Sequence, residues 1–160
     1  MAQPGPQIDE KSRIADQLQR AFEGDAWHGP AVLEVLEGVS ARAAASKPLK
    51  GAHSIWEIVL HIAAWDGAIR QRMGGQALQL SPEQDFPPVK DASDSAWRSA
   101  VQALKQCHAE LIAAVLAMPD HRLTSQVPGK DYDFYHMLHG AVQHELYHAG
   151  QIALLKKVAA

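Results

Sequence analysis

The segment from Ser54 to Met73 constrains the fold most, because it predicts a long helix that is apolar on most of its sides. Ser54 and Glu57 have the spacing of a capping box, which is typical of a helix start. Gly74-Gly75 predicts the end of this helix. A helix with so little polar surface has to be covered by other elements, so we expect it at the centre of the fold.

Further segments show the 3.6-residue apolar period of amphipathic helices. Three long ones cover residues 8–22, 94–118 and 134–158, with Asp9 and Glu10 expected in the first turn of the first. A short one follows Pro30, a residue that suits the first turn of a helix. No run of alternating residues predicts a strand. The sequence therefore predicts an all-α fold, a four-helix bundle with long crossover connections and a short extra helix near the N-terminus.

Two stretches have the composition of connections. Residues 76–92 contain three prolines and are long enough to be a crossover, and residues 40–52 are rich in alanine, serine and lysine. We expect residues 1–7 to be a disordered lead-in, because they are polar with two prolines and a glycine. Residues 8–160 are then a single domain, large enough to bury a core.

The composition narrows the classes of function. The chain is 47% hydrophobic and 21% charged, as is usual for a globular protein. Its net charge of −3 gives no basic surface for a nucleic acid. One cysteine excludes an intrachain disulfide and fits a reducing compartment. Because no apolar leader and no membrane-length apolar stretch is present, we expect a cytoplasmic protein without a membrane partner.

Nine histidines are many for 160 residues, and two of them, His144 and His148, share one face of the expected last helix with Gln151. With Glu145 they spell H-E-x-x-H, the pattern of zinc peptidases. No Asp, Glu or His follows His148, so the downstream third ligand of such a peptidase is missing. A peptidase is therefore not favoured. Glu145 lies about 80° from the centre of this face and is retained only as a candidate general base.

His61 is the expected third ligand, because it lies among apolar residues in the middle of the central helix. A buried imidazole without a partner costs roughly 1–3 kcal/mol, so His61 has to be hydrogen-bonded or ligated. Together with His144 and His148 it predicts a site for Zn²⁺ or Ni²⁺ with open positions for water or substrate. The alternative is that all three are ordinary surface or hydrogen-bonded core histidines.

Other side chains are candidates for the walls of this site or for hydrogen bonds to its ligands. They are Trp27, His28, Glu57, Trp65 and Gln151. Structural alternatives remain open for them: the capping box accounts for Glu57, and core packing accounts for Trp65. Trp27 and His28 are equally well explained as the start of the short Pro30 helix.

Three stretches of this chain resemble the DinB-like (DNA-damage-inducible) superfamily, which includes bacillithiol transferases and mycothiol-dependent enzymes. They are residues 26–30 (Ala-Trp-His-Gly-Pro), 53–65 and 139–152, in matching order and spacing. The resemblance implies a DinB/YfiT-like four-helix bundle that holds nickel or zinc through the positions of His61, His144 and His148. It also implies a homodimer.

With this resemblance, the expected site favours a metal-dependent enzyme that activates a thiol for attack on a small electrophile, as a thiol S-transferase does. The implied partners are a small-molecule substrate and a low-molecular-weight thiol. A metal-dependent hydrolase would use the same chemistry with water. A non-catalytic stress-response module that binds a metal or ligand is the alternative from another class.

Overall fold

The computed structural model describes residues 9–159, which are mostly helical. The four long helices are α1 (Glu10–Glu23), α4 (Ile55–Met73), α6 (Asp94–Ala117) and α7 (Phe134–Val158). The short ones are α2 (Val32–Leu36), α3 (Ala41–Ala45), α5 (Pro82–Asp85) and the 3₁₀-helix η1 (Asp120–Thr124). Residues 9–159 form no β-strand, only an isolated bridge between Gln126 and Asp133. The predicted all-α class is confirmed.

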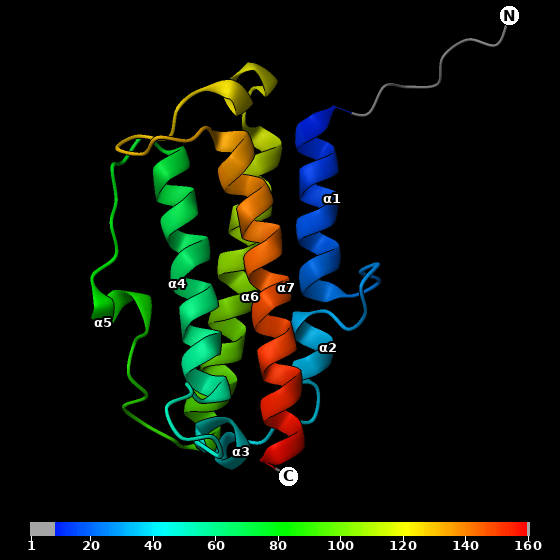
Figure 1. Ribbon diagram of the computed structural model, residues 1–160, viewed down its shortest axis with the longest axis vertical. Helices are drawn as coiled ribbons and strands as arrows, with labels where there is room; N and C mark the ends of the chain where they lie inside the picture. The colour runs from blue at the N-terminus through cyan, green and yellow to red at the C-terminus, as the bar shows by residue number, and fades with distance from the viewer. Residues whose placement is uncertain (1–8, 160) are drawn as a thin grey trace, which may run out of the picture.

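The long helices pack side by side, with α1 and α4 each in contact with both α6 and α7. In Figure 1, α4 and α6 run upward and α1 and α7 run downward. Because α4 and α6 are parallel, the chain between them returns along the outer side of α4, with α5 midway (Figure 1). This segment is the long crossover expected at residues 76–92. None of the helices described between residues 9 and 159 has the length and apolar character that a bilayer span needs.

Side-chain caps begin three of the long helices where the sequence predicts them. The Ser54 hydroxyl accepts the Glu57 N–H at 3.1 Å, and the Glu57 carboxylate accepts the Ser54 N–H at 2.8 Å. Ser93 and Asp133 are the N-cap residues of α6 and α7, and the side chain of each accepts a main-chain N–H from the first turn of its helix. As expected from its apolar surface, α4 is largely buried.

The first two helix starts differ from the prediction. Asp9 is the N-cap of α1 and accepts the Ser12 N–H, so it precedes the first turn. Ile8 and the expected lead-in lie outside the described residues. Pro30 also lies before its helix: α2 begins at Val32.

One short helix, α5, was not expected within the crossover. Ser81 and Gln84 form a capping box, and Pro82 occupies the first helical position. This is a recognisable start signal, but the helix that follows is a single turn with no buried residue.

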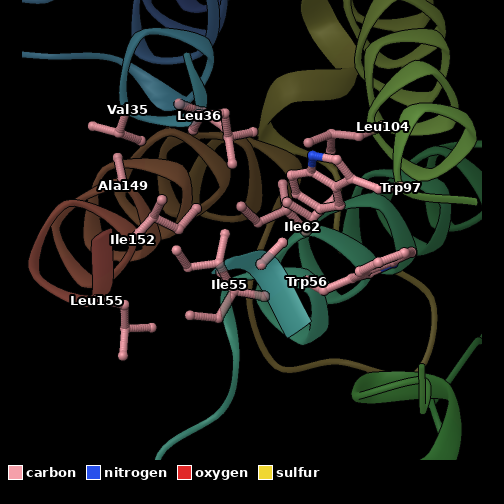
Figure 2. Packing of buried hydrophobic residues seen from close by; sticks show 14 of the residues in the cluster. Val35, Leu36, Ile55, Trp56, Ile62, Trp97, Leu104, Ala149, Ile152 and Leu155 are labelled. Atoms are coloured by element: carbon pink, nitrogen blue, oxygen red, sulfur yellow. The ribbon is translucent and has the colours of Figure 1, made fainter. Parts of the chain in front are cut away.

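Two hydrophobic clusters fill the space between the helices. Figure 2 shows the first, where side chains of α2, α4, α6 and α7 meet, including Ile55, Ile62, Leu104 and Ile152. The second lies toward the opposite ends of the long helices and includes Ile14, Leu18, Leu111 and Leu138. Between the clusters, at the same level of α4, α6 and α7, are three buried polar residues, Asp66, His108 and Glu145. We call these three residues the polar layer.

Candidate metal centre

Three histidines from two helices converge on one point. His61 projects from α4, and His144 and His148 project one turn apart from α7. The Nε2 atom of His144 lies 2.9 Å from Nε2 of His61 and 3.1 Å from Nε2 of His148. The structure thus brings together His144 and His148, which the helical spacing singled out, and His61, which its apolar neighbours singled out.

Two of these rings are oriented by hydrogen bonds at their other nitrogen. His61 Nδ1 lies 2.7 Å from the main-chain oxygen of Asp85, and His148 Nδ1 lies 2.7 Å from Oε1 of Gln151. Since both partners are acceptors, each Nδ1 carries the proton and each Nε2 presents a lone pair to the centre. His144 Nε2 has at most one proton to donate, so it cannot satisfy both neighbours well. This arrangement fits an electron-pair acceptor such as a metal ion.

The spacing and protonation of the imidazoles agree with this fit. A zinc ion about 2.0–2.1 Å from two imidazole nitrogens holds them roughly 3–3.4 Å apart, close to the separations found here. Burial lowers the pKa of His148 to about 4. Burial and the neighbouring histidines lower the pKa of His144 to about 3, and burial lowers that of His61. All three are therefore neutral at pH 7, the form that binds metal.

The crossover closes one side of this centre. The Phe86 ring stacks between the rings of His53 and His61, with centroids 3.7 and 3.9 Å away. Trp65 Nε1 donates to the carboxylate of Asp85 at 2.7 Å, which ties the crossover to α4. The turn formed by α5 thus holds both the main-chain acceptor and the ring that fix His61.

The histidines line a cavity of about 670 Å³, within the range of small-molecule sites. Part of its wall is apolar and comes from Ile69, Met137 and Ala141. Arg72 and Tyr132 add polar groups to the wall. The centre is therefore accessible to a small molecule from this cavity.

The structure places the other candidate residues differently. Trp65 and Gln151 lie at the cavity, as described above. Trp27 and His28 lie in the exposed loop between α1 and α2 and do not line the cavity. This loop and α5 lie on opposite sides of the molecule (Figure 1). Glu57 is occupied by the Ser54 cap and by an ion pair with Lys47 Nζ at 2.7 Å, so it contacts no ligand histidine.

Glu145 is the main correction to the sequence prediction. It is 1% exposed and is not part of the cavity wall. One residue beyond His144, it is rotated by about 100° around α7 and faces α6. Its Oε1 lies 2.9 Å from Nδ1 of His108. A carboxylate placed there is not positioned to act as a general base at the histidine centre.

The polar layer is buried on all sides. His108 Nδ1 lies 3.4 Å from Asp66 as well as close to Glu145, although neither contact has the angle of a good hydrogen bond. The His108 ring stacks on Phe22 of α1 at 3.9 Å. Burial lowers the pKa of His108, but its two carboxylate neighbours raise it to about 9, and burial raises that of Glu145 to about 7.

The ligand atoms of the polar layer also converge, within 4.8 Å of one another, so their composition and spacing are compatible with a metal ion. No residue of this group lines the cavity, so it offers no open position to a substrate. The sequence pattern does not single out Asp66, and it indicates His108 only as part of a helical face. Each of α4, α6 and α7 has one of these polar residues at a position that faces the core. That pattern was the sequence signal from which the polar layer could have been predicted.

Comparison with known proteins adds one match. A family model described as the DinB superfamily matches residues 26–152, which is most of the chain and includes all three converging histidines. Neither the search of curated proteins nor the search of solved structures gave a match.

Proposed function

The chain belongs to the DinB superfamily, and from this we propose that it is a metal-dependent enzyme whose divalent ion is held by His61, His144 and His148. We further propose that the site activates a low-molecular-weight thiol for attack on a small electrophile. One observation carries the proposal: three neutral imidazoles converge with Nε2 separations of 2.9 and 3.1 Å in the wall of a cavity.

The donor set suits zinc or nickel, since imidazole is a good ligand for both. Three protein ligands are the usual number at catalytic zinc sites, whereas structural sites are closed by four. A divalent ion bound there supplies Lewis acidity, which lowers the pKa of a thiol or water ligand. Because the ligands are neutral, they leave the full positive charge of the ion in place.

The chain's own groups prepare the site in three ways. The Asp85 carbonyl and the Gln151 amide hold two of the rings in the tautomer that presents Nε2. The stacked ring of Phe86 covers the outer face of His61. Asp85 is the carboxylate that lines the cavity, so we assign to it, rather than to Glu145, the acceptance of a proton from the incoming nucleophile.

Hydrolysis is the second candidate function, because the same open cavity admits water as readily as a thiol. The two reactions differ only in the nucleophile. A non-catalytic module would need neither an open ligand position nor a cavity beside the histidines, so the geometry favours an enzyme.

The proposal is tested by supplying purified zinc- or nickel-loaded protein with an electrophile such as monochlorobimane and with glutathione, bacillithiol or mycothiol in turn. We expect metal-dependent conjugation with at least one thiol, lost on chelation and restored by adding metal back. Metal-dependent turnover of ester substrates without any thiol would favour the hydrolase. Stoichiometric metal without either activity would favour the non-catalytic module.

A further inference from the structure

Arg72 is a buried charge without a counter-ion. It lies near the end of α4 and is 2% exposed. Charged side chains at this depth are normally paired, because an unpaired buried charge is costly. Within residues 9–159, however, no carboxylate forms an ion pair with its guanidinium, whereas its exposed neighbour Arg70 pairs with Glu110.

The groups that do touch Arg72 orient its charge without neutralising it. Its Nε donates to the Leu78 main-chain oxygen at 3.0 Å, and its Nη1 lies 3.5 Å from the Tyr132 hydroxyl. The guanidinium carbon lies over the Trp65 ring, 5.3 Å from the centroid. None of these partners is anionic. A guanidinium has five N–H donors, and these contacts use only a part of them.

Arg72 lines the same cavity as the three histidines. Both groups adjoin the Trp65 ring: the guanidinium carbon lies 5.3 Å from its centroid, and the centroid of His144 lies 5.8 Å from it. The distance from the guanidinium carbon to the His144 ring centroid therefore cannot exceed the sum of these two distances. The cavity therefore presents a cationic group and the histidine centre to the same small ligand, with the apolar residue Ile69 also in the wall.

We propose that Arg72 binds a carboxylate of the small molecule whose reactive group is directed to His61, His144 and His148. The substrate class is thereby narrowed to small carboxylic acids with an apolar chain of a few carbons. The carboxylate supplies the missing counter-ion, and a planar guanidinium is well suited to receive it. The assignment of the ligand's reactive group to the three histidines rests on the proposed metal function. The binding of the ligand's carboxylate by Arg72 does not rest on it.

The test is a titration of metal-loaded protein with two matched thiols, 4-mercaptobutanoate and 4-mercaptobutan-1-ol, followed by calorimetry. We expect the acid to bind at least roughly tenfold more tightly than the alcohol, as for a charge-assisted contact. Arg72→Gln should bring the two affinities together at unchanged metal content. Arg70→Gln, an exposed neighbour outside the cavity, should keep the preference.

A parallel pair, 4-chlorobutanoate and 4-chlorobutan-1-ol, shows whether the carboxylate belongs to the thiol or to the electrophile.

Several outcomes separate this proposal from the metal proposal. Equal binding of acid and alcohol by the wild type, or an unchanged preference in folded Arg72→Gln, overturns the carboxylate site. If Arg72→Gln does not fold, the wild-type comparison decides alone, and Arg72→Lys, which keeps the charge, should retain most of the preference. His148→Ala should lose metal but keep the preference for the acid. The binding of the carboxylate by Arg72 can therefore be tested even if the metal proposal fails.

Discussion

At the scale of single residues, one step along α7 separates two buried polar groups with different chemistry. His144 faces the cavity and the other ligand histidines, and Glu145 faces the polar layer. The first group consists of neutral bases with lone pairs available to a ligand. The second consists of two carboxyl groups and an imidazole that lie together and are buried from water. The two groups therefore lie on different faces of α7, one at the cavity and the other toward α4 and α6.

The polar layer makes a prediction about stability and pH. His108 faces Asp66 of α4, Glu145 of α7 and Phe22 of α1, and its pKa is raised to about 9 from 6.5. A raised imidazole pKa stabilises the fold fully below the unfolded value, and this contribution is lost as pH rises through about 9. We expect the free energy of unfolding to fall by up to roughly 3 kcal/mol between pH 6 and 10.

Urea unfolding of chelator-treated protein across this pH range measures the effect. His108→Gln should remove the part of the loss that is centred near pH 9 and leave the part that comes from the buried carboxyl groups of Asp66 and Glu145. His121→Gln, at an exposed histidine of η1, should leave the whole loss unchanged. A wild-type stability that is constant from pH 6 to 10 would contradict a charged His108 between the two carboxyl groups.

Residue positions around a single helix were predictable, whereas partners from other helices were not. The 100° step per residue placed His144, His148 and Gln151 on one face, and the structure agrees. The same geometry put Glu145 off this face, but nothing local indicated that His108 and Asp66 would meet it. That contact depends on how α4, α6 and α7 pack together.

At the scale of elements, the helices follow their local start and stop signals. The starts at Ser54, Ser93 and Asp133 were predictable because each cap residue precedes a strong apolar period. The single turn of α5 has a cap but no apolar period, so it did not stand out. Its functional contact, the Asp85 carbonyl on His61, is a main-chain interaction that no residue pattern encodes.

The same substitution at two caps should therefore have different effects. Ser54→Ala removes the buried cap of the central helix and should lower the free energy of unfolding by about 1 kcal/mol. Ser81→Ala, at the exposed cap of α5, should change it by less than about 0.5 kcal/mol. Because α5 carries the acceptor for His61, Ser81→Ala should instead weaken zinc binding, by up to roughly tenfold.

Urea unfolding in chelator and zinc competition with a chelating dye measure the two quantities separately. A Ser81→Ala variant with unchanged zinc affinity would show that α5 does not control the orientation of His61. A loss of global stability in Ser81→Ala equal to that in Ser54→Ala would contradict the independence of the two helices.

At the scale of the whole molecule, the candidate centre joins parts of the chain that are far apart in sequence. It takes His61 from α4, two ligands from α7 and a supporting carbonyl from the crossover between α4 and α6. An ion bound only by the folded protein adds to its stability by mass action. Metal binding should thus fasten α7 and the crossover onto α4.

The expected homodimer and cytoplasmic location stay predictions.

The most direct test is the metal content of purified protein after zinc loading and desalting, measured by plasma mass spectrometry together with the melting temperature. We expect about one zinc per chain at the cavity and a higher melting temperature than in chelator. His148→Ala should lose this zinc and the temperature difference, and His139→Ala, on the same helix but outside the centre, should keep both. Unchanged zinc content in folded His148→Ala would contradict the three-histidine centre.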